Sequence, residues 1–585
     1  MKYRLKEKPL NMKAFNVLAD YLMKLGIEKI ESFIRKPDTT DEISPINLNN
    51  IRECIEELHY AFENNKKIFL QVDSDVDGIT SASIFYNYFK YYYPNCNITY
   101  RLHEGKQHGV ILDTIPEDAE YIIIPDAGTM QIKEQQELSK QGKKIIILDH
   151  HEVEEKIEDK NIILVNNQNS ENFENKWLSG AGVVFKCIQL FDNIYKAGNN
   201  KYKDFYDLAA LGILSDVMDS RTLDNNYIIY NGLKNINNKM FKALLKKQEY
   251  HLSSVDNPNK IDIVWYIAPV INAIIRAGTP IEKEELFVGF IESPKKSKIV
   301  SEIKGNLIEE NYYEYVARNS LKVRSRQNSQ KIKAVEFLKS KIEKEGFDKN
   351  KIIIAIASKK DAVVIPRNLS GLIAMELVKI YNKPALMLFE TTDENNEIKF
   401  SGSGRAQVVL NFPSFLQYMR DSDSYDFAQG HAFAFGCSIK GKDLDKFIEE
   451  CNKKLENVEF NESCYAVDLI IKDESIDTRR LFPLAKCQHI YGNGIPEVLI
   501  AIEGIVVPQD VMLMGANKNS VKINMSNISC VKFKDSDLAE KLTNFSSAKV
   551  KLVGKLKINE YMGYESLQLF IEDIEVDKKE KKELF

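Results

Sequence analysis

The sequence predicts an α/β protein built on a parallel sheet, with a second α/β domain and a C-terminal β-barrel. Between residues 51 and about 240, apolar runs of strand length alternate with helical stretches, as βαβ units require. The same alternation begins again at residue 351. From about residue 464 it gives way to short alternating apolar segments separated by glycine turns, which is typical of small barrels.

The composition fits a large globular protein. Its 585 residues suffice for three or four domains, and 44% hydrophobic with 28% charged residues is ordinary for such chains. No run of eighteen apolar residues occurs, so we expect no membrane span. The first residues lack an apolar leader, and the eight cysteines form no Cys-x-x-Cys pair, so we expect a cytoplasmic protein. The net charge of −5 does not exclude nucleic acid as a partner, since a local basic track can meet phosphates.

Changes of pattern along the chain suggest five regions. They are an N-terminal helical region (1–50), a first α/β domain (51–307), a connecting helix (308–345), a second α/β domain (346–457) and a barrel (464–585). The charged connecting stretch suits either a helix that bridges two lobes or a solvated bundle helix. The aromatic tract at residues 85–93 could stack bases, but its place after an Asp-Gly turn favours a packed crossover helix.

Three carboxylates alternate along the backbone directly after the first apolar run. Asp73, Asp75 and Asp77 follow residues 68–72, and Gly78 lets the chain turn. An acidic turn or a calcium loop would also fit this spacing, but a calcium loop needs a Glu six positions after the glycine, where Ile84 stands. The spacing therefore favours a divalent cation held by oxygen ligands.

Three further apolar runs end in acids or histidines. Asp126 follows residues 122–125, Asp149-His150-His151 follows residues 145–148, and Asp216 follows a helical stretch at residues 208–214. The carboxyl ends of parallel strands meet at one sheet edge, so we expect these side chains to converge there. Mixed Asp oxygens and His nitrogens suit Mn²⁺ or another transition ion better than Ca²⁺.

These four motifs resemble those of the DHH phosphoesterase superfamily. Other segments resemble RecJ-type 5′→3′ exonucleases specific for single-stranded DNA, and the resemblance runs from about residue 51 to the end of the chain. The segments that resemble these exonucleases are Leu178-Ser-Gly-Ala-Gly, Asn272-Ala-Ile-Ile-Arg276, Ser401-Gly-Ser-Gly-Arg405 and Gln429-Gly-His431. The sequence departs from that pattern at Ile275, where glycine is usual, and at Gln429-Gly430, where a glycine pair is usual.

The resemblance implies that the second domain is a substrate-binding (DHHA1-like) domain and that the barrel is an OB-fold. It also implies two Mn²⁺ ions, with Mg²⁺ as an alternative, which activate water for attack on a phosphodiester. The expected metal ligands are Asp73, Asp75, Asp77, Asp126, His150 and Asp216. Asp126 is expected to bridge the ions, Asp149 to orient a histidine, and His151 to touch the scissile phosphate or orient the nucleophile.

Substrate contacts are expected across the cleft. By the resemblance, the phosphate-binding candidates are Asn272, Arg276, Ser403, Arg405 and His431, with Arg101 as a weaker match in the loop 101–109. Amide and guanidinium groups donate to phosphate oxygens, and arginine can do so with two parallel hydrogen bonds.

The leading hypothesis is a metal-dependent 5′→3′ exonuclease on single-stranded DNA, with a role in recombination and repair. A DHH phosphodiesterase for short oligoribonucleotides or cyclic dinucleotides is the alternative, but those enzymes and the related pyrophosphatases lack a barrel after the second domain. A scaffold that had lost its metals would be expected to lack some of the acids and histidines, which are all present. We expect a monomer that binds single-stranded DNA, with a single-strand binding protein or a helicase left open as a partner.

Overall fold

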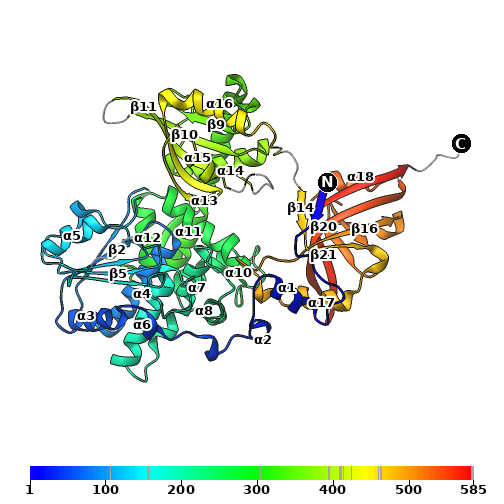
Figure 1. The fold of residues 1–585 in the computed structure, drawn as a ribbon. Helices are drawn as coiled ribbons and strands as arrows, with labels where there is room; N and C mark the ends of the chain where they lie inside the picture. Colours follow the sequence, from blue (N-terminus) through cyan, green and yellow to red (C-terminus); the bar gives the residue numbers. More distant parts are fainter. Residues whose placement is uncertain are drawn as a thin grey trace.

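The computed structural model describes residues 1–105, 107–153, 158–303, 305–392, 396–407, 412, 414–422, 424–458, 460, 464–543 and 545–580. In Figure 1 the first α/β domain lies at the lower left, the second above it, and the C-terminal β domain at the right. Within these ranges no helix is long and apolar enough to cross a membrane.

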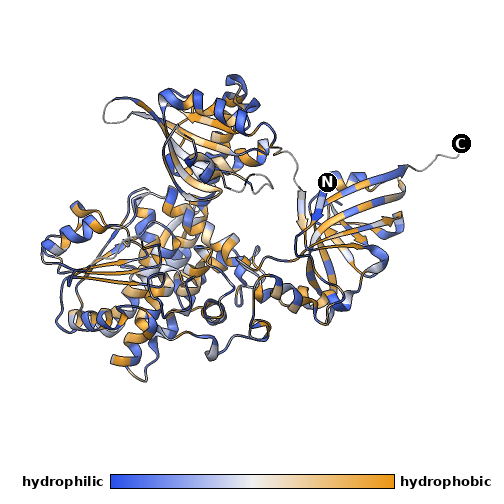
Figure 2. Ribbon diagram, in the orientation of Figure 1, coloured by the Kyte–Doolittle hydropathy of each residue, from blue (hydrophilic) through white to orange (hydrophobic). Residues whose placement is uncertain are grey.

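A five-stranded parallel sheet organises the first domain, in the order β3-β2-β4-β5-β6. The strands are β2 (Ile68–Val72), β3 (Ile98–Leu102), β4 (Tyr121–Pro125), β5 (Lys144–Asp149) and β6 (Ile162–Asn166). Helices α3 (Ile51–Glu63), α4 (Val76–Tyr92), α5 (Ile132–Lys140) and α6 (Gly180–Tyr195) connect or cover them. Every residue of β2 and β4 is buried, which explains their predominantly apolar sequences, drawn mostly orange in Figure 2.

The aromatic tract belongs to the packed crossover helix. Phe85, Tyr88 and Phe89 of α4 are completely buried in the core of the first domain. Helices α7 (Tyr206–Ser215), α8 (Leu223–Lys234), α9 (Lys239–Lys247), α10 (Lys260–Asp262), α11 (Ala268–Ala277) and α12 (Pro280–Phe290) complete that domain, followed by the hairpin β7 (Lys298–Ile303) and β8 (Asn306–Asn311).

Helix α13 (Tyr312–Glu345) bridges two cores. Val316 and Val323 near its start pack into the core of the first domain, whereas Leu338 and Ile342 near its end pack into the second. The helix is therefore a structural connection between the two α/β domains and not only a solvated bundle helix.

The second domain carries a sheet in the order β12-β13-β11-β10-β9, in which only the β9–β10 pair is parallel. Its strands are β9 (Ile353–Ala357), β10 (Ala385–Thr392), β11 (Ile398–Arg405), β12 (Tyr425–His431) and β13 (Ala434–Lys440), and its helices are α14 (Ser370–Tyr381), α15 (Phe415–Arg420) and α16 (Leu444–Lys454). Residues alternate between two cores: Leu386 faces one and Met387 the other, as the strand period of two requires.

A seven-stranded sheet in the order β15-β16-β20-β21-β19-β18-β17 forms the C-terminal domain. Its elements are β15 (Leu469–Lys472), α17 (Thr478–Lys486), β16 (Leu499–Val506), β17 (Val511–Met514), β18 (Ser520–Asn524), β19 (Ser529–Lys532), α18 (Ser536–Lys541), β20 (Phe545–Tyr561) and β21 (Tyr564–Glu580). Lys551 and Lys555 of β20 pair with Glu575 and Glu572 at 3.2 and 2.6 Å, so glutamates balance part of its basic surface.

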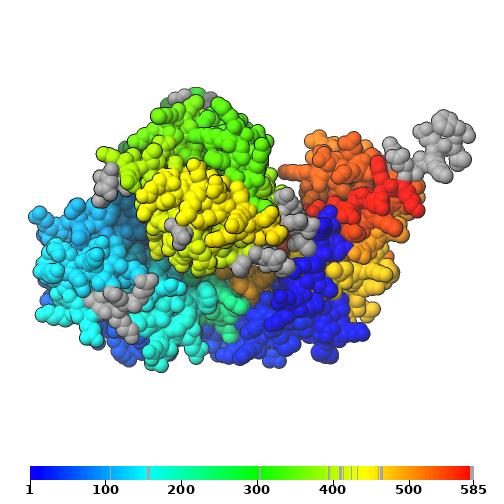
Figure 3. All heavy atoms as spheres, turned by 45° about the horizontal axis from the view of Figure 1, so that its top comes forward, coloured from blue at the N-terminus to red at the C-terminus, as the bar shows by residue number. Residues whose placement is uncertain are grey.

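The N-terminal residues join the C-terminal domain, which differs from the expected separate region 1–50. Strand β1 (Lys2–Leu5) pairs in parallel with β14 (Cys464–Val467), and α1 (Val17–Lys24) packs against α17. Short α2 (Ile30–Ile34) follows. Leu18 and Leu22 are buried in the same core as the barrel strands, and Figure 3 shows the blue N-terminal residues lying against the C-terminal domain.

Candidate metal centre

The Asp73–Gly78 segment turns from β2 directly into α4. Asp75 is the N-cap of α4, where its side chain accepts a hydrogen bond from the Gly78 N–H at 2.9 Å. A Cβ at Gly78 would lie 2.7 Å from the Cβ of Asp73, so only glycine permits this turn. The tight turn brings the three alternating carboxylates to the carboxyl edge of the sheet.

Asp126 follows β4 at the centre of this edge. Its φ of 62° lies in the left-handed region, and its N–H donates to the Leu148 carbonyl at 2.9 Å. A Cβ at Gly180 would come within 2.4 Å of Asp126 Oδ1, so the small residue leaves room for this carboxylate. Among the described residues, the buried Oδ1 accepts no hydrogen bond of suitable geometry, although the His150 ring lies close to it. An oxygen held in this way suits a cation.

His150 lies among three carboxylates. Its Nε2 is 3.3 Å from Asp126 Oδ1, 3.5 Å from Asp216 Oδ2 and 3.9 Å from Asp77 Oδ2. The start of α6 holds the Asp77 carboxylate in place, because the N–H groups of Gly180 and Ala181 donate to it at 2.6 and 3.1 Å.

The ligand atoms form overlapping groups that are each small enough to surround one ion. Asp77, His150 and Asp216 form one group, Asp73, Asp75 and Asp126 form another, and the atoms of each lie within 4.8 Å of one another. Asp126 also belongs to a third group, with Asp149, His150 and His151. All six predicted ligands are thus brought together, with Asp126 shared between groups.

Burial and repulsion between neighbouring carboxylates disfavour the ionised forms of several acids in this cluster. Burial, Asp73 and Asp77 raise the pKa of Asp75 to about 6, and burial together with Asp77 and Asp75 raises that of Asp216 to about 8. Burial and the charge of Asp77 raise the pKa of Asp126 well above its usual range. Bound divalent ions would supply positive charge and so stabilise the ionised carboxylates. The residues present therefore fit a divalent metal.

Asp149 supports a histidine from the side of β5. Its Oδ2 accepts from Thr129 Oγ1 at 2.6 Å, and its Oδ1 lies 2.7 Å from His151 Nδ1. This hydrogen bond raises the pKa of His151 to about 9 despite partial burial. Because the imidazole remains more than half exposed, it can reach a bound molecule.

Two histidines beside Asp73 were not predicted. His108 Nδ1 lies 2.9 Å from Asp73 Oδ2, and His103 Nε2 lies 3.4 Å from its Oδ1. Burial alone would raise the pKa of Asp73, but hydrogen bonds from both histidines hold it at about 2. Arg101 contacts His103 Nδ1 at 3.1 Å, so it supports this loop in the structure.

A cleft lined by both α/β domains lies beside the metal centre, to which it is linked by the contact of His108 with Asp73. The cleft has a volume of about 1050 Å³ and is lined by His108 from the first domain and by Arg367, Ser403 and Arg405 from the second. Ser403 is buried and hydrogen-bonds Ser370 at 2.8 Å, whereas Arg405 Nη1 donates to the Gly404 carbonyl.

Arg276 and Arg405 approach each other from opposite domains. Burial lowers the pKa of both, and the charge of Arg276 lowers that of Arg405 further. The charge of Asp75 opposes this lowering at Arg276, so Arg276 is within electrostatic range of both the acidic cluster and Arg405. Asn272 and Arg276 of α11 line a second groove, of about 660 Å³, against α13. His431 ends β12 opposite Ala434, but its side chain lies outside the described part of the structure.

Comparison with known proteins assigns the family. Residues 67–213 match the DHH family, N-terminal domain, and residues 467–573 match the RecJ OB domain. A putative single-strand DNA-specific exonuclease, YorK, of an SPβ prophage in Bacillus subtilis is 34% identical over 97% of this chain and 98% of its own length. The chain belongs to the RecJ family.

Other RecJ proteins are more distant. RecJ of Bacillus subtilis is 24% identical and is matched over 96% of this chain and 68% of its own length. The crystal structure of RecJ from Thermus thermophilus in complex with Mn²⁺ covers 98% of this chain and 79% of its own, with a TM-score of 0.71 and 16% identity. This likeness shows that the chain has the RecJ fold, with a mixed α/β core and a C-terminal OB domain.

Proposed function

We propose that this RecJ-family protein is a divalent-metal-dependent exonuclease that hydrolyses phosphodiester bonds of single-stranded DNA from the 5′ end. The observation that carries the proposal is an acidic metal centre near two arginines, Arg276 and Arg405, which come from different domains and act electrostatically on each other. A phosphodiester can bridge these regions, since its oxygens interact favourably with both metal ions and guanidinium groups. The names of the relatives support the substrate class.

Two ligand groups, connected by a third that contains both Asp126 and His150, support a site for two ions. Asp73 and Asp75 would hold one, Asp77, Asp216 and His150 the other, and Asp126 would lie between them. Mn²⁺ and Mg²⁺ both suit these oxygen-rich groups, and the histidine favours Mn²⁺. When bound, such ions lower the pKa of a water molecule and offset the charge that develops on phosphate.

The surrounding side chains have separate roles in this mechanism. Asp149 holds the His151 imidazole protonated, so that its Nε2 can donate a hydrogen bond to a phosphate oxygen during the in-line displacement. Arg276 and Arg405 hold the strand so that its terminal phosphodiester remains at the carboxyl edge of the sheet. Arg101, Ser403 and His431 are proposed to add contacts to the DNA backbone along the cleft, and Asn272 to add one in the groove beside α13.

The decisive experiment combines purified protein, Mn²⁺ and single strands of DNA and RNA labelled at the 5′ or the 3′ end. We expect immediate release of labelled mononucleotide from 5′-labelled DNA and delayed release from 3′-labelled DNA. RNA should be a much poorer substrate. Immediate release from the 3′ label would reverse the polarity, and a preference for RNA or dinucleotides would favour an oligonucleotide phosphodiesterase.

A further inference from the structure

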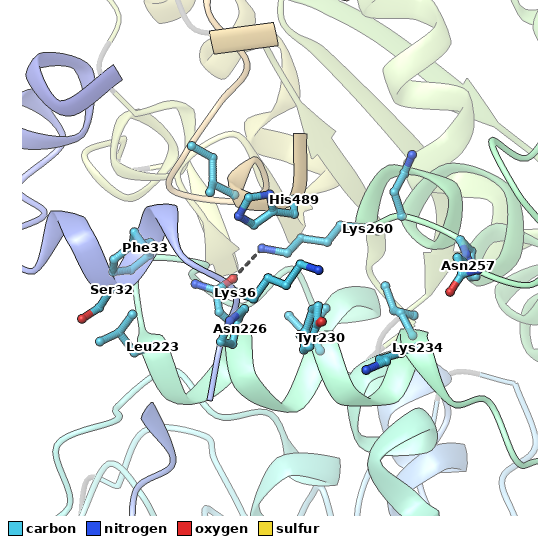
Figure 4. A pocket seen from close by; sticks show the side chains of 16 residues that line it. Ser32, Phe33, Lys36, Leu223, Asn226, Tyr230, Lys234, Asn257, Lys260 and His489 are labelled. Carbon is cyan, nitrogen blue, oxygen red and sulfur yellow. Dashed lines mark hydrogen bonds between the residues drawn. The ribbon is translucent and has the colours of Figure 1, made fainter. Parts of the chain in front are cut away.

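A second pocket lies where three distant segments meet, away from the residues of the metal centre. It has a volume of about 460 Å³, within the range of small-molecule sites. Its walls come from α2 and the residues after it, from α8 with residues 257–260, and from residues 489–490 of the C-terminal domain. Figure 4 shows the Lys260 side chain extending into it toward His489 and Asn226.

Lys260 is a buried cation in this pocket. Only 8% of the residue is exposed, and its Nζ donates to Asn226 Oδ1 at 2.5 Å. Burial lowers its pKa to about 7, with no carboxylate among the causes. An ammonium group can donate three hydrogen bonds, and the described wall of the pocket contains neither Asp nor Glu to accept them. Among the described residues that line the pocket, the buried charge therefore has no counterion.

Other basic groups surround the same space. Lys36, Lys234 and His489 also line the pocket, and the positive charge of Lys260 adds to burial in lowering the pKa of His489. The three lysines, with no acid among the described residues that line the pocket, produce a positive potential that favours an anion.

The remaining wall is apolar and partly aromatic. Phe33 is buried on one side, and the Tyr230 ring, which lies 5.8 Å from Lys234 Nζ, forms part of the opposite wall. Leu223, Ile229 and Leu233 also line the pocket. A ligand that satisfies both kinds of surface needs an anionic group joined to a flat, weakly polar body.

We propose that this pocket binds a nucleoside monophosphate unit, with its phosphate at Lys260, Lys36 and His489 and its base between Phe33 and Tyr230. The identity of the ligand rests on the proposed function, because 5′ hydrolysis of DNA releases nucleoside monophosphates. The same unit could come from two sources, a free product molecule or one nucleotide of the bound strand. Because three regions of the chain form the walls, occupancy would also tie the C-terminal domain to the first domain.

The test is calorimetric titration of thymidine 5′-monophosphate into the full-length, metal-loaded protein. We expect saturable binding that persists in Asp126→Asn, which separates this pocket from the metal centre. Lys260→Met should weaken it by about tenfold or more, because a charge-assisted contact is lost. Lys36→Ala, at an exposed position, should weaken it without affecting folding, and Lys242→Ala, an exposed lysine of α9, is the matched control.

The source of the nucleotide follows from the affinity of the same variants for a long single strand. If a strand nucleotide occupies the pocket, Lys260→Met and Lys36→Ala should weaken strand binding and the free nucleotide should compete with DNA. If the free product occupies it, strand affinity should not change. The proposal is overturned if binding is absent, if it disappears in Asp126→Asn, or if neither lysine variant weakens it. Because binding is measured without turnover, a lack of DNA hydrolysis would refute the proposed function and leave this result interpretable.

Discussion

Oδ1 of Asp149 lies 2.7 Å from Nδ1 of His151, while the other oxygen of Asp149 accepts hydrogen bonds from the N–H and hydroxyl of Thr129. The carboxylate is completely buried, so its position is fixed by these contacts and not by solvent. The imidazole therefore has one nitrogen held by the protein, while the ring remains more than half exposed. A histidine arranged in this way is positioned before a substrate arrives.

Asp149→Asn should lower kcat by roughly 10- to 100-fold, as expected for loss of a group that orients an active-site residue. The amide keeps the shape of the side chain but loses the charge that keeps His151 protonated. Metal content, measured by atomic absorption, should stay near that of the unchanged protein. A kcat within twofold of the unchanged protein would show that the Asp149–His151 contact is only structural.

Asp126→Asn should abolish hydrolysis while strand binding is largely retained. Asparagine tolerates the left-handed backbone at this position, whereas alanine adds strain, so the asparagine variant is the cleaner test. The loss should be far greater than the roughly 10- to 100-fold typical of residues outside the ligand shell. Strand affinity by fluorescence anisotropy and turnover with Mn²⁺ check the two parts. Near-normal turnover would remove Asp126 from the centre.

Arg276→Ala and Arg405→Ala should each lower kcat/KM for single-stranded DNA by roughly 10- to 100-fold, because each removes a charge-assisted contact worth about 1.5–3 kcal/mol. Their metal content should not change, since neither is a metal ligand. Arg52→Ala, at an exposed position of α3, serves as the matched control. If both cleft variants keep the control's kcat/KM, the arginines do not hold the strand.

Lys260→Met should stabilise the protein in a pH-dependent way. The Lys260 pKa falls from the usual 10.5 to about 7 on folding, so between these values the unfolded chain binds more protons and the stability of the unchanged protein rises with pH. The gain from methionine should therefore be largest below pH 7 and disappear toward pH 10.5. At pH 7 we expect the free energy of unfolding to rise by about 1–2 kcal/mol, because loss of the hydrogen bond to Asn226 offsets part of the gain. Urea unfolding at several pH values measures this, with exposed Lys242→Met as control. A gain independent of pH would mean that the Lys260 charge is not the cause.

The metal centre could be predicted because its chemistry is local in the sequence. Each ligand follows an apolar run, and a parallel sheet collects the ends of such runs at one edge. His103 and His108 could not be found in this way, since they lie in a loop whose conformation no periodic pattern reports. The β1–β14 pairing was also missed: β1 has four residues, three of them exposed, and so has no hydropathy signal. The pocket at Lys260 could not be predicted either, because it joins residues 32–37, 223–260 and 489–490, which are far apart in the sequence.

The shared N- and C-terminal core changes how the role of the barrel must be tested. A chain that ends at residue 457 would leave Leu18 and Leu22 of α1 without the core that buries them, so we expect it to aggregate. A chain spanning 38–457 removes both halves of that core and keeps every metal ligand. Its metal content should equal that of the full-length protein.

The affinity of the 38–457 chain for long single strands should fall, because base stacking worth about 1–3 kcal/mol per base would be lost. Its affinity should also depend less on salt, because fewer counterions would be released on binding. Activity on a dinucleotide should barely change, since so short a substrate lies within the cleft between the two α/β domains. The comparison requires both proteins on a long strand and on a dinucleotide across a salt series. Equal losses on both substrates would mean that the barrel only supports the fold, and would favour the short-oligonucleotide alternative.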